Sequence, residues 1–212
     1  MEQFAALERA AASGDISAFQ IIKQEAEKGD ANAQTILGAS YMMGSGTPKD
    51  FNEGFIWLKK AAEQGNAEAQ CFLFHCYSKG QGVKRDPSEG FKWLKKSASQ
   101  GLPVPQLYLA YCYRDGDGVT KDLAEAVKWY RKSAYQGNVD AQESLGRCYV
   151  LGEGVDEDMV QAYAYINLTL TKNPRAREGL KLMEGTMTPE QIASAQKLTK
   201  EIQNIIDNSK GK

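Results

Sequence analysis

The hydrophobic and polar positions of this chain repeat at a fixed interval of 36 residues. Apolar and aromatic residues recur in three series: Leu37, Leu73, Leu109 and Leu145; Tyr41, Tyr77, Tyr113 and Tyr149; Trp57, Trp93, Trp129 and Tyr165. Polar residues and glycines recur in the same register: Gln34, Gln70, Gln106 and Gln142; Gly44, Gly80, Gly116 and Gly152; Asp50, Asp86, Asp122 and Asp158. A fixed period of this length without insertions is typical of a solenoid, in which each repeat packs against its neighbours.

The pattern within each repeat predicts two helices. Leu37 and Tyr41 lie four residues apart, so they share one face of a first helix that we expect over residues 31–43. The glycine three residues after Tyr41 lies where a left-handed backbone would end that helix. Asp50 then begins a second helix as its N-cap, and Glu53 completes a capping-box pattern. Four such pairs predict an all-α protein of about ten to twelve helices without a sheet.

The repeats divide the chain into three parts. Residues 26–168 hold the four repeats, residues 1–25 form N-terminal capping helices, and residues 169–212 form C-terminal capping helices. The third repeat departs from the pattern, because residues 102–105 at the start of its first helix read Leu-Pro-Val-Pro. Proline restricts the residue before it and lacks an N–H group, so we expect this helix to begin late or to be shorter.

Charge and composition exclude several classes of function. The chain has 26 basic and 27 acidic residues and a formal net charge of -1, so it has no global attraction for nucleic acid or for an anionic membrane. Its apolar residues form no window long enough to cross a bilayer, and its first residues lack the basic start and unbroken apolar core of a signal peptide. We therefore expect a soluble cytoplasmic protein.

Candidates for catalysis or metal binding are few. The single histidine, His75, lies four residues after Cys71 on one predicted helix, but a zinc site needs further ligands and none is evident. Cys76, Cys112 and Cys148 occupy one column. Equivalent helices stack about 10 Å apart, whereas the Cα atoms of a disulfide lie about 4.4 to 6.8 Å apart, so we expect free thiols. The sequence predicts no catalytic residue, no metal and no cofactor.

The second copy of the repeat shows the family resemblance most fully. Its matching residues are Ala69, Gln70, Leu73, Tyr77, Gly80, Gln81, Gly82, Val83, Asp86, Trp93 and Lys96. This gapped pattern resembles the Sel-1-like repeat, a relative of the tetratricopeptide repeat, and it recurs over residues 26–168. The resemblance implies a right-handed α/α superhelical solenoid of antiparallel helix pairs that scaffolds protein complexes. Many members are bacterial, and some serve in signalling, host interaction or toxin immunity.

A hydrolase is the alternative from another functional class. Some relatives with two cysteines per repeat have proposed penicillin-binding activity, but that cysteine pairing is absent here. The resemblance therefore favours a non-enzymatic scaffold or adaptor that binds another protein or peptide in its concave groove. Such a protein could serve as a bacterial regulatory, host-interaction or toxin-immunity protein.

The binding residues are expected where the repeats differ from one another. Four first-helix columns vary in this way: Ala39, His75, Tyr111 and Arg147; Met42, Ser78, Arg114 and Val150; Met43, Lys79, Asp115 and Leu151; Thr35, Cys71, Leu107 and Glu143. By resemblance to tetratricopeptide-type superhelices, such positions face the concave groove. The implied patch has Tyr111, Arg114 and Arg147 at its centre and His75 and Asp115 at its edge. Aromatic and arginine side chains dominate binding hot spots, and this set suits an acidic or carbonyl-rich segment.

The alternative for these varied columns is that they are unconstrained surface. Neither Tyr111 nor Arg147 stands in a constant column. We therefore expect that replacing both with alanine weakens partner binding and leaves thermal stability nearly unchanged.

Overall fold

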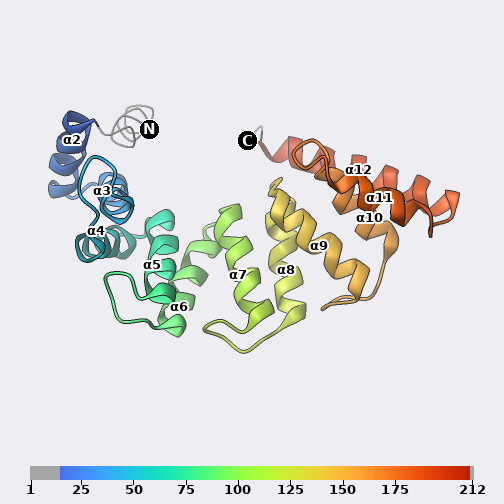
Figure 1. Ribbon diagram of the computed structural model, residues 1–212, viewed down its shortest axis with the longest axis horizontal. Helices are drawn as coiled ribbons and strands as arrows, with labels where there is room; N and C mark the ends of the chain where they lie inside the picture. Colours follow the sequence, from blue (N-terminus) through green and yellow to red (C-terminus); the bar gives the residue numbers. More distant parts are fainter. Residues whose placement is uncertain (1–14, 211–212) are drawn as a thin grey trace. The chain divides into compact units, whose positions relative to one another are not determined.

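The computed structural model describes residues 15–210, which form eleven α-helices and contain no strand (Figure 1). The helices are α2 (Ile16–Glu27), α3 (Ala31–Met43), α4 (Phe51–Glu63), α5 (Ala67–Lys79), α6 (Pro87–Ser99), α7 (Pro103–Asp115), α8 (Leu123–Ala134), α9 (Val139–Leu151), α10 (Met159–Leu168), α11 (Ala176–Glu184) and α12 (Pro189–Lys210). The predicted all-α fold class is therefore confirmed. Of the N-terminal capping helices predicted over residues 1–25, residues 1–14 lie outside the described residues, and α2 covers the remainder.

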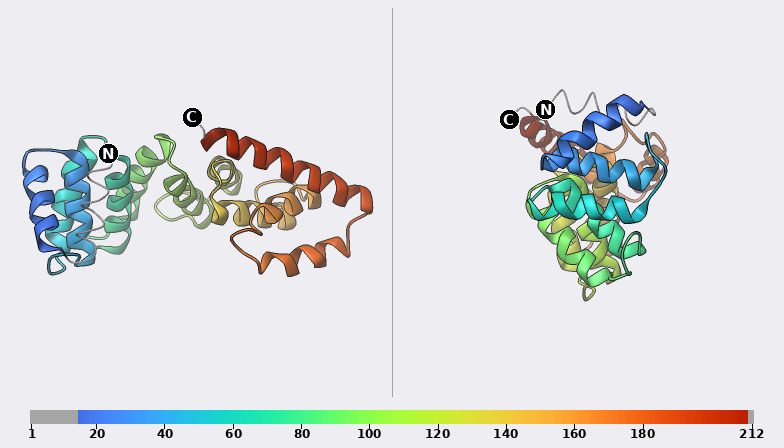
Figure 2. Two further views of the ribbon diagram at one scale, coloured as in Figure 1. Left: turned by 90° about the horizontal axis from the view of Figure 1, so that it is seen from above. Right: turned by 90° about the vertical axis from the view of Figure 1, so that its left-hand side faces the viewer.

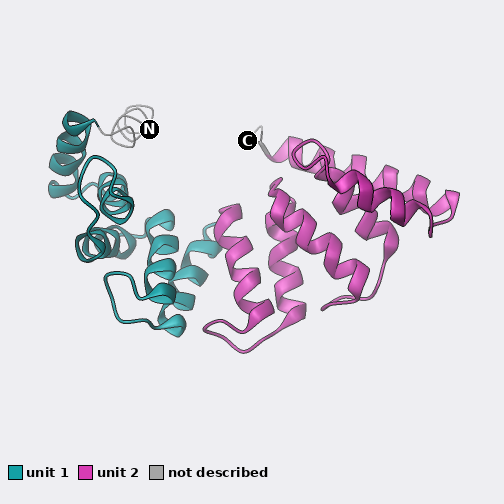
Figure 3. Cartoon of the chain, viewed as in Figure 1, with its two compact units in different colours: residues 1–100 teal, residues 101–212 magenta. Residues whose placement is uncertain are grey.

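The chain divides into two compact units (Figure 3). Unit 1 is Met1–Gln100 and holds α2 to α6, whereas unit 2 is Gly101–Lys212 and holds α7 to α12. Consecutive helices pack against each other from α2 to α6 in unit 1 and from α7 to α10 in unit 2. In unit 2, α12 packs along α10, and α11 also contacts α10 (Figure 2). Both α11 and α12 lie in the segment predicted to hold the C-terminal capping helices.

The helix boundaries follow the 36-residue period. The first helices α3, α5, α7 and α9 each span 13 residues and begin at the same position of the repeat. The expectation that the proline-rich start would delay or shorten α7 is wrong. Pro103 occupies the first helical position, where an N–H group would have no intrahelical acceptor, and Leu102 has the extended backbone that precedes proline. Pro105 also lies among the first four helical residues, which lack such acceptors.

Aspartate caps begin the second helices, as predicted. The Oδ1 atom of Asp86 accepts a hydrogen bond from the backbone N–H of Glu89 at 3.0 Å, and the column aspartates of the other three repeats cap their helices in the same way. The backbone N–H of Asp86 donates to the carbonyl of Tyr77 at 2.9 Å, where a capping box would have used the Glu89 side chain. This bond recurs in every repeat and ties the start of each second helix to the end of the first.

Among the described residues, buried hydrophobic side chains form two clusters in unit 1 and one cluster in unit 2. The column leucines of the first helices are all fully buried. On the second helices, Leu58, Leu94 and Tyr130 occupy one column and are 0%, 0% and 1% exposed. Tyr130 therefore carries a hydroxyl group into the core of unit 2, at a position where unit 1 holds leucine.

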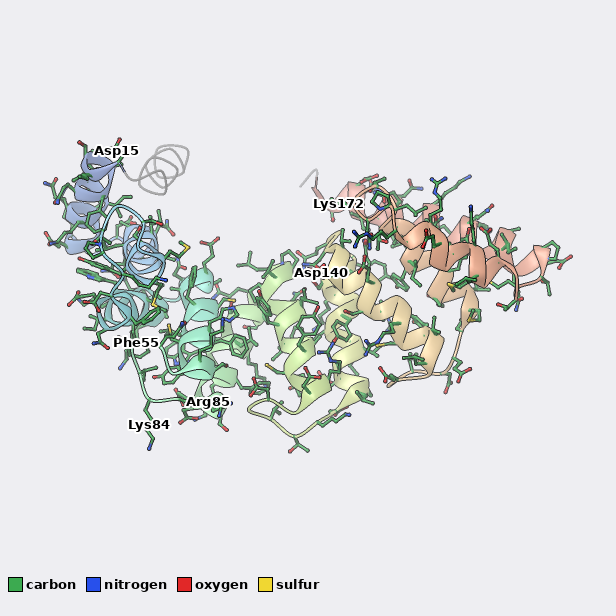
Figure 4. The ribbon with its side chains drawn as sticks, viewed as in Figure 1. Asp15, Phe55, Lys84, Arg85, Asp140 and Lys172 are labelled. Atoms are coloured by element: carbon green, nitrogen blue, oxygen red, sulfur yellow. The ribbon has the colours of Figure 1, made fainter. Side chains whose placement is uncertain are left out.

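Glycines allow the loop after each first helix to turn and to pack closely. Gly80 ends α5 with a left-handed φ of 69°, and Gly82 has a φ of 71°. A Cβ atom at Gly82 would collide with the backbone carbonyl of Phe51 in the preceding helix pair. The loop continues to Lys84, whose side chain points away from the helices (Figure 4). These glycines therefore serve the turn and its close packing.

Candidate partner-binding surface

Three of the predicted binding residues form one connected group at the end of α7. The guanidinium of Arg114 lies over the ring of Tyr111, with Cζ 4.6 Å from the ring centroid. Its Nε and Nη2 atoms donate to the two carboxylate oxygens of Asp115, each at 2.7 Å. This bidentate bond raises the pKa of Arg114 and lowers the pKa of Asp115, so both groups are charged at physiological pH.

Tyr111 is partly buried and contributes to packing. Its ring meets the ring of Tyr130 edge-on, with centroids 5.7 Å apart, and it contacts the ring of Tyr108 at 6.4 Å. It also packs against the core of unit 2. Tyr111→Ala would lose these ring contacts, so we now expect it to reduce stability, whereas the sequence pattern predicted little change.

Arg147 lies on α9 and is the more accessible of the two arginines. Its side chain is 62% exposed, compared with 32% for Arg114. Its Nη2 atom lies 3.7 Å from Oε2 of Glu153, which belongs to the turn after α9. That distance is too long for a hydrogen bond, so the ion pair holds the guanidinium only loosely.

Arg114 and Arg147 line the same pocket in unit 2, among α7, α8 and α9, with a volume of about 190 Å³. The pocket is lined by Arg114, Tyr130, Glu143, Ser144, Arg147, Cys148 and Glu153. The Tyr130 hydroxyl is buried and has no hydrogen-bond partner among the described residues. Burial raises the pKa of this phenol, so the hydroxyl stays neutral and can donate or accept. Glu143 is already held, because it accepts a hydrogen bond from Nδ2 of Asn173 at 2.6 Å.

Two departures from the repeat pattern meet in this pocket. Ser144 stands in a first-helix column that otherwise holds Ile36, Phe72 and Tyr108. Tyr130 stands in a second-helix column that otherwise holds Leu58, Leu94 and Ile166. The small side chain of Ser144 leaves space at this position, and Tyr130 brings a polar group to it. Sequence reasoning missed both residues. The signal that could have found them is a single small or polar residue in an otherwise apolar column.

His75 belongs to unit 1 and lines a different pocket, with a volume of about 280 Å³. That pocket is lined by Met42, Met43, Lys49, Phe51, Phe72, His75, Lys79 and Gln81. Its lining is apolar and basic. Burial and the nearby charge of Lys79 lower the pKa of His75, so the imidazole is neutral at pH 7. The structure thus brings Tyr111, Arg114, Asp115 and Arg147 together in unit 2 and places His75 in unit 1.

The two pockets occupy equivalent places in the repeat. The positions of Met42, Phe72 and His75 in the unit 1 pocket correspond, two periods later, to Arg114, Ser144 and Arg147 in the unit 2 pocket. The backbone therefore offers the same site in both units, and the side chains make it apolar in one and polar in the other.

The cysteine thiols of the described residues are buried or partly buried. Over residues 15–210, no group of three or more His, Cys, Asp or Glu side chains is placed to hold a metal ion. Cys71, Cys76, Cys112 and Cys148 are free thiols. Burial raises the pKa of Cys71 to about 12 and of Cys76 to about 11, so these thiols are protonated at neutral pH. Within the part of the chain that the structure describes, no helix is long and apolar enough to cross a membrane.

Four consecutive segments of the chain match the Sel1 repeat family: residues 31–66, 67–102, 106–138 and 139–168. They cover more than half of the chain and coincide with the helix pairs α3–α4, α5–α6, α7–α8 and α9–α10. The chain belongs to the Sel1 repeat family. The resemblance seen in the sequence is therefore confirmed.

Solved structures of other Sel1 repeat proteins have a similar fold. A Sel1 repeat protein from Oxalobacter formigenes is 32% identical, with a TM-score of 0.73, covering 80% of this chain and 50% of that one. A protective antigen of uropathogenic Escherichia coli strains is 26% identical, with a TM-score of 0.55, covering 93% of this chain and 51% of that one. The chain thus spans about half the length of these two proteins.

An immunity protein from Pseudomonas aeruginosa is similar over a greater share of its own length. It is 20% identical, with a TM-score of 0.52, covering 97% of this chain and 81% of that one, which shows a shared fold alone. No curated protein sequence matches the chain.

Proposed function

We propose that this Sel1 repeat protein is a non-enzymatic scaffold or adaptor that binds another protein or peptide. The observation that carries the proposal is the unit 2 pocket, where Arg114 and Arg147 flank a buried hydroxyl that has no hydrogen-bond partner among the described residues. We name the surface formed by Tyr111, Arg114, Arg147 and this pocket the α7–α9 surface. Arginine and tyrosine are enriched among the residues that dominate protein–protein binding.

The side chains support binding more strongly than hydrolysis. A cysteine nucleophile requires a thiolate, and the raised pKa of Cys71 disfavours one beside the only histidine. Four free thiols also suit a reducing compartment, so we place the binding reaction in the cytoplasm.

The roles of two proteins of similar structure indicate which biological roles to consider for this protein. One similar structure is an immunity protein and another is a protective antigen. We therefore propose a bacterial regulatory, host-interaction or toxin-immunity role, in which the α7–α9 surface holds the partner.

Affinity purification followed by calorimetry tests this proposal. The wild-type protein, Arg147→Ala and the control Arg177→Ala would each be used to isolate partners from the native cell. Arg177 is an exposed arginine of α11 that lies outside the pocket lining. We expect a protein that is retained by the wild type and Arg177→Ala. With purified components, Arg147→Ala should weaken its binding by about 2 kcal/mol, roughly 30-fold, as truncation of a hot-spot residue does.

One result would contradict the proposal. Equal affinity of the partner for wild type and Arg147→Ala would exclude the α7–α9 surface as the binding site. Thermal unfolding of both variants provides the control, because each replaced side chain is exposed and its loss should leave the melting temperature unchanged.

A further inference from the structure

We propose that the unit 2 pocket receives the carboxylate of one acidic side chain of the partner, in the place now taken by the protein's own Glu153. The inference rests on the proposed function and adds the chemical class of the residue that is recognised. In this arrangement Arg147 and Arg114 pair with the incoming charge, and the hydroxyls of Tyr130 and Ser144 donate hydrogen bonds to it.

The first argument is the Tyr130 hydroxyl. A buried hydroxyl without a hydrogen-bond partner destabilises the folded protein, and the other repeats avoid this cost with aliphatic residues in the same column. Tyr130 also interacts electrostatically with Arg114 and Cys148, which both line the pocket. A polar group held at such a cost beside an open pocket is explained if a ligand completes its hydrogen bonding.

The second argument is the position of Glu153. Its carboxylate already lies beside Arg147, which marks a place where a carboxylate is accommodated. The 3.7 Å separation is loose, and Glu153 belongs to a turn, so exchange for a partner's carboxylate costs little. The incoming group gains the Tyr130 hydroxyl, which has no hydrogen-bond partner among the described residues while Glu153 is in place.

The third argument concerns the remaining groups of the pocket. Asp115 fixes the orientation of Arg114 with two hydrogen bonds, and the guanidinium retains further N–H groups for a ligand. Glu143 opposes an incoming anion, and the hydrogen bond that it accepts from Asn173 fixes its carboxylate in place without removing the charge. Glu153 is the carboxylate that pairs with Arg147 and that the ligand would replace, so it is the residue to change.

Three small probes and two variants test the inference. The probes are N-acetylglutamate N-methylamide, its uncharged glutamine counterpart and its lysine counterpart, each titrated into the isotope-labelled full chain and followed by NMR at Ser144 and Arg147. We expect saturable binding of the glutamate probe alone, with a dissociation constant on the order of millimolar for a ligand of this size. Tyr130→Phe should weaken this binding by about tenfold, as loss of a hydrogen bond to a charged group does.

Glu153→Gln should change the affinity for the glutamate probe in the opposite direction. It removes the competing carboxylate from the turn after α9 and should strengthen binding of the glutamate probe several-fold. Stronger binding of the lysine or glutamine probe, weaker glutamate binding by Glu153→Gln, or no saturable binding by any probe would each overturn the inference.

The two proposals fail in different ways. A partner that depends on Arg147 while the glutamate probe does not bind would leave the proposed function intact and remove only the acidic anchor. Glutamate binding at Ser144 without any protein partner that depends on Arg147 would leave the pocket as a carboxylate site and remove the scaffold function. Melting curves of Tyr130→Phe show whether weaker probe binding by this variant arises from the lost hydroxyl or from unfolding of the protein.

Discussion

At the scale of single residues, the hydroxyl of Tyr130 lowers the stability of the folded protein and is explained by a role in binding. It is 1% exposed, and its hydroxyl has no hydrogen-bond partner within the described chain. Leaving a buried hydroxyl unsatisfied costs about 1–3 kcal/mol, whereas the ring itself packs well against Tyr111. Sites at which a protein keeps an unfavourable group are often functional. The unsatisfied hydroxyl of Tyr130 therefore supports a binding function for the pocket beside it.

Tyr130→Phe should therefore leave the protein as stable as the wild type or stabilise it by about 1 kcal/mol, because the ring packing is kept and an unsatisfied group is removed. The matched control is Tyr163→Phe. The hydroxyl of Tyr163 donates to Glu184 at 2.7 Å, so its removal should destabilise by about 1 kcal/mol. Urea unfolding of both variants measures the difference. Equal destabilisation by the two changes would show that the Tyr130 hydroxyl makes a favourable interaction in solution.

The sequence could predict Arg114 and Arg147 as candidate binding residues, because their columns hold a different residue type in each repeat. It could not predict that they share a pocket with Tyr130 and Ser144. Those two residues lie on α8 and α9, and their meeting depends on how helices pack. His75 stands in the same column as Arg147 but lines a different pocket, in unit 1, so the column alone does not show which residues line one pocket.

At the scale of helices, the buried glutamines Gln34, Gln70 and Gln142 each donate a hydrogen bond to the end of the helix before their own, within one unit. The Nε2 atom of Gln70 in α5 donates to the carbonyl of Ala62 at the end of α4, at 3.2 Å. Its Oε1 atom accepts from Nε2 of Gln100, which follows α6, at 2.9 Å. The Ala62 carbonyl also accepts from the backbone N–H of Gly65 at 3.0 Å, so the glutamine adds a second donor to this helix end and connects three helices. This explains why the glutamine column is constant, which the pattern alone did not.

Gln70→Met should destabilise the protein by about 1 kcal/mol, because it keeps the volume of the side chain but removes the hydrogen bonds with the Ala62 carbonyl and the Gln100 amide, which each keep another hydrogen bond. Gln20→Met is the control, since Gln20 is an exposed residue of α2. Thermal and urea unfolding compare the two variants. A Gln70→Met protein that unfolds with the wild type would mean that water replaces both hydrogen bonds, and that the glutamine column is not a structural link.

Helix boundaries were predictable because their signals are local. Gly80 and Asp86 each act through their own backbone and nearest neighbours, so the end of α5 and the start of α6 follow from residue type. The start of α7 differs from the expectation because Pro103 occupies the first helical position, where proline disturbs no intrahelical hydrogen bond. At helix starts, position within the first turn matters more than the presence of proline.

At the scale of the whole molecule, stability is expected to be local. Buried side chains form separate clusters, with Leu37 in one cluster of unit 1 and Leu145 in the cluster of unit 2. Repeat proteins of this kind are stabilised by each repeat and by its contacts with neighbouring repeats. A destabilising substitution in one repeat should therefore reduce the stability of that repeat and of the repeats in contact with it, and leave the others unchanged.

Hydrogen exchange of two matched variants tests this expectation. Leu37 and Leu145 are both fully buried in the same column, so Leu37→Ala and Leu145→Ala should each cost about 2–5 kcal/mol. For Leu37→Ala, we expect faster exchange in α2, α3 and α4, with α9, α10 and α12 retaining their protection, because the lost contacts belong to unit 1. Leu145→Ala should give the reverse pattern. An equal rise in exchange across all helices for either variant would show instead that both units unfold in one cooperative step, and that local stability does not describe this solenoid.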